Sequence, residues 1–163
     1  MMSHIREMGK IGSSDFGNIV IVRGMVQKIS WSSCPPLFLD DIVGWISRRL
    51  LTSRKKEITI MRSYSLLLED ESGEVWYRGL KGTHDRDAIC AGEGIIACGV
   101  VKISGTEPYL SFLKKKTFPS FIVRPSRLTR ESVRGEKEKA FFATLKKNFP
   151  EIFRWPDIAD LVK

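Results

Sequence analysis

The chain has 163 residues, of which 42% are hydrophobic and 28% are charged, and its formal net charge at pH 7 is +8. This hydrophobic content is enough for a packed core and argues against a wholly disordered chain, while the length fits one domain with an appendage. The basic excess lies mainly in residues 113–163, which carry 13 Lys and Arg against 6 Asp and Glu. This balance favours polyanionic partners, nucleic acid before acidic membrane surfaces.

The three cysteines, Cys34, Cys90 and Cys98, form no Cys-x-x-Cys pair, which is typical of a reducing compartment. The N-terminus lacks the apolar core of a secretion signal, and no apolar run reaches the length of about 18 residues that a membrane span needs. We therefore expect a soluble intracellular protein, in the cytoplasm or at the nucleoid or nucleus, with no membrane partner.

Residues 1–17 are rich in Gly, Ser and charge and are expected to form a flexible arm. The next run, NIVIVRGMVQKIS at residues 18–30, alternates as a strand does, and Gly24 within it indicates a bulge or sharp bend. Residues 36–52 change period, with apolar side chains at helical spacing after Pro36, so they predict a helical insertion.

Two further strands are predicted at residues 57–70 and 74–80, joined by a tight turn at residues 71–73. In the second of them, side chains alternate between faces. If Val75 and Tyr77 fill a core, then Trp76 and Arg78 stand together on the outside. An exposed aromatic ring beside a guanidinium suits a surface that stacks bases and holds phosphates.

The fourth strand is expected at residues 95–103, with a bend at Gly99, and the fifth at residues 108–113 after a hairpin loop. Residues 117–163 follow as a basic strap rich in Pro, Ser and Arg, and then as C-terminal helices. The last of these helices is expected to have Pro156 in its first position.

The runs NIVIVRGMVQKIS, YSLLLEDESGEVWYRG and GEGIIACGVVKISGTEPYLSF resemble strands one, two–three and four–five of an OB-fold. They are similar in particular to the single-stranded-DNA-binding domains of the replication protein A group, archaeal members included. The resemblance covers residues 18–116. It implies a mainly β, five-stranded OB-fold barrel. The residues themselves add an inserted helix between strands one and two, where such barrels usually have a short loop, and a C-terminal helical extension.

In such barrels the outer face of strands two and three receives nucleic acid. The expected function is therefore binding of single-stranded DNA or RNA, DNA being favoured, with little sequence specificity, in replication or repair. The aromatic candidates for base stacking are Trp76 and Tyr109. The basic candidates for phosphate contact are Arg78, Arg62, Arg23, Lys28, Lys114, Lys115 and Lys116. The alternative for Trp76 is packing beneath the inserted helix or the C-terminal strap, and the alternative for the lysine run is an ordinary soluble edge.

A dense apolar group near the C-terminus includes Phe142, Leu145 and Phe149. These side chains either pack on the barrel or bind other subunits of a replication or repair complex. The second reading gives the alternative function, an OB-fold interaction subunit. No Walker loop, nucleophile elbow or paired-carboxylate signature is present, so we expect no enzyme, and we predict no cofactor or metal.

Overall fold

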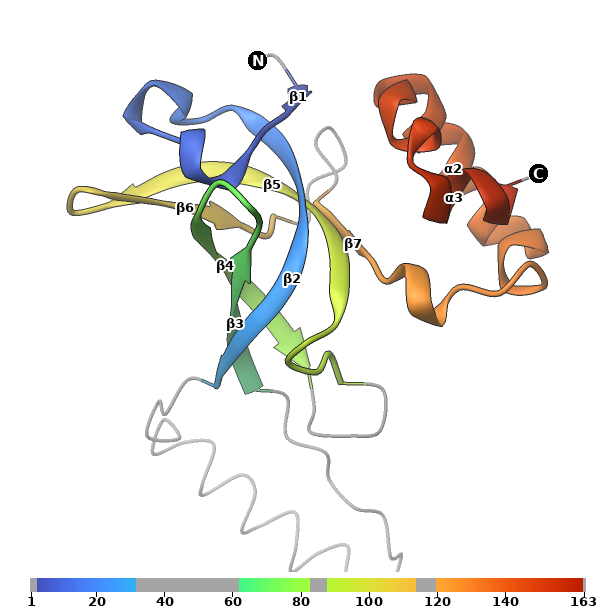
Figure 1. Cartoon of the computed structure of the whole chain (residues 1–163), viewed down its shortest axis with the longest axis horizontal. Coiled ribbons are helices and arrows are strands. Elements are labelled where there is room, and N and C mark those ends of the chain that lie inside the picture. Colours follow the sequence, from blue (N-terminus) through green and yellow to red (C-terminus); the bar gives the residue numbers. More distant parts are fainter. Residues whose placement is uncertain (1–2, 32–61, 83–87, 114–119, 163) are drawn as a thin grey trace, which may run out of the picture.

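The computed structural model describes residues 3–31, 62–82, 88–113 and 120–162, and Figure 1 shows their arrangement. The strands are β1 (Ser3–Ile5), β2 (Ile19–Trp31), β3 (Arg62–Glu69), β4 (Glu74–Gly82), β5 (Gly94–Ser104), β6 (Glu107–Ser111) and β7 (Phe121–Val123). The helices are α2 (Glu136–Asn148) and α3 (Pro156–Val162), and the 3-10 turns are η1 (Met8–Lys10), η2 (Ser13–Asp15), η3 (Pro125–Arg127), η4 (Ser132–Arg134) and η5 (Pro150–Arg154).

The strands form one sheet in the order β1-β2-β3-β4-β6-β5-β7, and an additional pairing of β2 with β5 closes five of them into a ring. Strands β4 and β6 run parallel, and the other neighbours in the ring are antiparallel. This arrangement confirms the predicted mainly β architecture with C-terminal helices. The predicted insertion at residues 36–52 lies outside the described residues.

The ring closes because β2 and β5 bend and change partners. Residues 19–25 of β2 pair with β5, and residues 25–31 pair with β3. Where β2 changes its partner from β5 to β3, a Cβ atom on Gly24 would lie 2.2 Å from the carbonyl oxygen of Glu69. A Cβ on Gly99 of β5 would similarly lie 2.9 Å from the carbonyl oxygen of Ser111. Only glycine permits such close backbone contacts, which agrees with the bends that the sequence predicts at both positions.

The N-terminal segment differs from the flexible arm that its composition predicts. Strand β1 pairs in parallel with β2, and Met8 is 2% exposed within the core. The backbone N–H groups of Met8 and Gly9 donate to the side chains of Asp70 and Ser72 in the β3–β4 turn. Gly9 permits this contact because a Cβ there would lie 2.1 Å from the carbonyl oxygen of Ser72. The buried side chain of Met8 and the close packing of Gly9 on the β3–β4 turn thus hold the segment in place. Neither feature can be read from the average composition of the segment.

The inside of the ring is filled by the side chains that alternate inward, as predicted for Val75 and Tyr77, which are 4% and 0% exposed. The Tyr77 hydroxyl donates to the carbonyl oxygen of Cys98 at 2.7 Å, so its polar end is satisfied in the core. Burial raises the pKa of the Cys98 thiol to about 12. This cysteine is therefore a neutral, small apolar residue at physiological pH.

The C-terminal segment covers the outer side of β2, β5 and β7 (Figure 1). Phe142, Leu145 and Phe149 are 6%, 3% and 7% exposed, and Phe149 lies edge-on to Phe121 of β7 with ring centroids 6.2 Å apart. All three belong to one apolar cluster with residues of the sheet, which agrees with the first of the two predicted readings, packing on the barrel. Partner binding by these residues stays a prediction. Within the described residues, no helix combines the length and apolar character that crossing a membrane requires.

Candidate functional site

Five residues from five neighbouring strands form a continuous row across the ring. Lys28 of β2 pairs with Leu67 of β3, Leu67 pairs with Trp76 of β4, Trp76 pairs with Tyr109 of β6, and Tyr109 pairs with Lys102 of β5. Residues directly opposite each other in a sheet point to the same face and lie about 5 Å apart. We call this set the cross-strand row.

The cross-strand row faces outward. Leu67 and Trp76 lie between fully or nearly buried residues of the inner core, and Tyr109 and Lys102 each have one such neighbour; these residues are Leu66, Leu68, Val75, Tyr77, Leu110 and Val101. Next to Lys28, the side chain of Ile29 packs against the same core. Since successive side chains alternate between faces, the row members point away from that core. Lys28 is exposed, and the other four are partly exposed, so the row meets solvent.

Arg78 extends the row toward the C-terminal end of β4. Its guanidinium carbon lies 4.8 Å from the centroid of the Tyr109 ring, a cation–π contact between adjacent strands. Arg78 is exposed and forms no ion pair within the described part of the chain. The guanidinium is therefore held over an aromatic face while its hydrogen-bond donors stay available to an anion.

Acidic residues border the row on its other side. Glu69 pairs with Glu74 across β3 and β4, two residues from Leu67 and Trp76 respectively, so both carboxylates share the outer face with the row. Their charge repels phosphate. An anion at this face would consequently be repelled on the side of Glu69 and Glu74 and attracted on the side of Arg78.

The structure does not place Arg23 in this row. Arg23 forms an ion pair with Asp157, and its guanidinium carbon lies 5.2 Å from the centroid of the Trp155 ring. It therefore fastens the C-terminal segment to β2. Arg62 is exposed on β3, but it pairs with Gly82, five residues before Leu67 and about 16 Å along the strand.

Sequence reasoning placed Trp76, Arg78, Tyr109 and Lys28 as candidates, and pairing brings all four together. It missed Leu67 and Lys102. The only sequence signal for these two residues is that they alternate with buried residues along their strands and therefore point outward. The candidates Lys114, Lys115 and Lys116 lie outside the described residues. They stay predictions.

The described part of the C-terminal strap does not pack on Trp76. The apolar cluster of the C-terminal segment includes residues of β2, β5 and β7, and Trp76 is not among its members. Trp76 is partly exposed and is not in the inner core. The described part of the strap therefore packs elsewhere.

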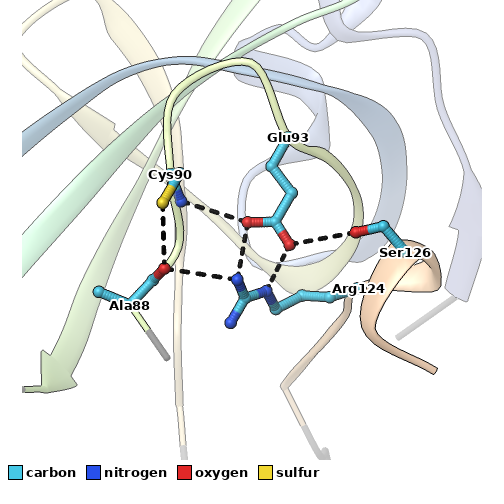
Figure 2. Close-up of polar contacts among 5 residues, drawn as sticks. All are labelled: Ala88, Cys90, Glu93, Arg124 and Ser126. Carbon is cyan, nitrogen blue, oxygen red and sulfur yellow. Dashed lines mark hydrogen bonds and ion pairs between the residues drawn. The ribbon is translucent and has the colours of Figure 1, made fainter. Parts of the chain in front are cut away.

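A second polar group joins the loop before β5 to the segment after β7 (Figure 2). Arg124 donates to both carboxylate oxygens of Glu93, at 2.6 and 2.8 Å, and the backbone N–H of Cys90 donates to Glu93 at 3.2 Å. Burial would raise the pKa of Glu93, but the hydrogen bonds and the charge of Arg124 hold it below its usual value. The two side chains are only 10% and 17% exposed, so this pair acts as a clamp between the two segments.

Among the described residues, no group of three or more His, Cys, Asp and Glu side chains is placed to hold a metal ion. Comparison with known proteins found no matching family model, no matching curated protein and no matching solved structure.

Proposed function

We propose that the five-stranded ring is an OB-fold and that its outer face at β3, β4 and β6 binds single-stranded nucleic acid, in particular DNA, with little sequence preference. Two features of the pairing support the fold. The first and fourth strands of the ring, β2 and β5, pair to close it, and the third and fifth, β4 and β6, lie side by side in parallel. In OB-folds the face of strands two and three, here β3 and β4, binds oligonucleotides.

The cross-strand row carries the functional proposal. It presents two aromatic side chains on adjacent strands, Trp76 and Tyr109, with a lysine at each end and Arg78 above one ring. Aromatic faces stack on bases of any sequence, at about 1–3 kcal/mol per base, and lysines and arginines neutralise the phosphates between them. A single strand crossing the β-strands would meet all of these groups in order.

The proposal places the protein inside the cell, on single strands exposed in replication or repair. A duplex fits this face poorly, because its bases are already stacked on each other and cannot reach Trp76 or Tyr109. RNA offers the same bases and phosphates. Matched DNA and RNA oligonucleotides of identical sequence are therefore the two arms of each titration.

Substitution of Trp76 tests the proposal. We expect Trp76→Ala to weaken binding of a fluorescein-labelled oligothymidylate by about 10- to 100-fold, because a stacking surface is lost. Trp76→Phe keeps an aromatic face and should retain most of the affinity, while Trp76→Leu keeps only apolar volume and should behave like alanine. Fluorescence anisotropy at fixed salt measures all three variants.

Circular dichroism and thermal unfolding of each variant show whether the ring is intact. Equal affinity of the alanine variant and the unsubstituted protein would contradict the assigned face. Equal affinity of the leucine and phenylalanine variants would contradict stacking as the source of the affinity.

A further inference from the structure

The C-terminal segment contains a basic-rimmed cavity that the proposed nucleic-acid face does not use. The cavity has a volume of about 260 Å³ and lies among η4, α2, η5 and α3. Its lining residues are Arg130, Val133, Arg134, Lys139, Phe142, Ala143, Lys146, Phe153, Leu161 and Val162. It is open to solvent at its rim and apolar at its floor.

One face of α2 forms a wall of this cavity. Lys139, Phe142, Ala143 and Lys146 follow each other at helical spacing, so they make one stripe about 10 Å long. Phe142 is buried at the floor, and Ala143 leaves room above the helix backbone. The stripe therefore places an apolar depression between two lysines.

The charge of the rim has one sign. Arg130, Arg134, Lys139 and Lys146 are all exposed, and none of them forms an ion pair within the described part of the chain. No acidic residue is among the described residues that line the cavity. Four like charges around one depression repel each other, and an acidic ligand would relieve that repulsion.

We propose that this cavity binds an acidic segment of a partner protein, with one large apolar side chain of that segment inserted between α2 and α3. The volume and apolar floor suit an apolar side chain, and the four cations suit Asp and Glu on either side of it. A nucleobase fits less well, because Phe142, Phe153 and Leu161 offer no hydrogen-bond partner to its polar edge.

The chain's own acidic turn is not the occupant that the cavity favours. Residues 69–74 carry four carboxylates, but the apolar residues that flank them, Leu68 and Val75, are buried in the inner core. This turn of a second copy would thus supply charge without an anchoring side chain. The proposed occupant is a segment of a different protein, and its recognition requires both charge and the apolar anchor.

The test uses the full chain and a labelled ten-residue peptide of Asp and Glu with one central Phe, beside the same peptide with a central Ser. We expect the Phe peptide to bind about tenfold more tightly or better, since burial of a large apolar side chain supplies this difference. Ala143→Leu fills the depression without changing charge and should abolish the preference for Phe. Equal binding of the two peptides, or binding of neither, would overturn the proposal.

Charge reversal on α2 gives a matched pair of variants. Lys139→Glu with Lys146→Glu alters the rim, whereas Lys137→Glu with Lys147→Glu alters the same helix outside the cavity. We expect the rim variant to lose at least tenfold in affinity for the Phe peptide and the control to change little. Equal losses in the two variants would overturn the proposal, because they would show only general charge attraction. Loss of oligonucleotide binding in the rim variant alone would also overturn it, because it would assign the cavity to nucleic acid.

Discussion

The outer surface of the ring has two regions that differ in what covers them. Over β2, β5 and β7 the outward residues include Ile19, Ile21 and Ile96, and the C-terminal segment buries them. Over β3, β4 and β6 the outward residues include Trp76 and Tyr109 and stay partly exposed. Aliphatic outward residues need a cover, while aromatic residues mixed with cations can face water and still offer contact area. Among the described residues, the region over β3, β4 and β6 is therefore the one left partly open to solvent, and we call it the open region.

The two regions also differ in the environment of one arginine each, Arg23 in the covered region and Arg78 in the open region. Arg23 and Arg78 each lie over an aromatic ring, at 5.2 Å from Trp155 and 4.8 Å from Tyr109. Arg23 is also paired with Asp157, so its charge is compensated inside the fold. Arg78 has no such partner among the described residues. Arg23 therefore contributes to packing, whereas the guanidinium of Arg78 is exposed to solvent.

The largest expected difference between the two regions is in stability. Phe149→Ala removes a side chain that is 7% exposed, and we expect it to lower the free energy of unfolding by about 3–5 kcal/mol. Tyr109→Ala on the open face should cost about 1 kcal/mol or less, because surface substitutions leave no buried cavity. Urea unfolding followed by circular dichroism measures both. Equal losses would mean that the two regions are packed alike.

The arginine pair is expected to separate binding from stability. Arg78→Gln should weaken oligonucleotide binding several-fold and reduce the slope of log affinity against log salt by about 1, because one phosphate contact is lost. Arg23→Gln should leave that slope unchanged and lower the free energy of unfolding by about 1 kcal/mol. Anisotropy titrations at several salt concentrations, with urea unfolding in parallel, measure the two effects. A slope that changes for Arg23→Gln and not for Arg78→Gln would reverse the assignment.

The smallest effect concerns the turn that borders the open region. Burial would raise the pKa of Asp70, but hydrogen bonds from Met8, Ser72 and Gly73 hold it below its usual value. The carboxylate therefore stabilises the fold above its unfolded pKa of about 4, and this contribution is lost as pH falls through the lower folded pKa. Asp70→Asn should cost about 1 kcal/mol at pH 7.

The same substitution should cost progressively less below pH 4, where protonation removes the carboxylate from the unsubstituted protein as well. Urea unfolding of the two proteins between pH 7 and pH 3 follows this difference. A cost that stays constant across that range would show that the charge of Asp70 has no part in fastening the N-terminal segment.

Sequence alternation predicted that Trp76 and Arg78 lie together on the outer face of their strand if Val75 and Tyr77 fill a core. It could not predict register, because the period of a single strand carries no information about its partners. The strand pairing is therefore needed to place Lys102 and Leu67 in the row.

Arg23 shows a second limit of sequence reasoning. Arg23 and Lys28 both point outward from β2, but the bend at Gly24 places them on opposite sides of the change of partner strand. Arg23 consequently meets the C-terminal segment, and Lys28 joins the open row. The sequence predicts the bend, but the ion pair of Arg23 depends on Asp157, which lies 134 residues further along the chain.

The most direct test of the account is an NMR titration of the full chain with a single-stranded oligothymidylate. We expect the largest shifts at the backbone amides of Trp76, Arg78, Tyr109 and Lys102 and at the indole N–H of Trp76, with little change at Ile19, Ile21 and Ile96. Shifts that concentrate on the C-terminal segment and leave β4 and β6 unchanged would contradict it.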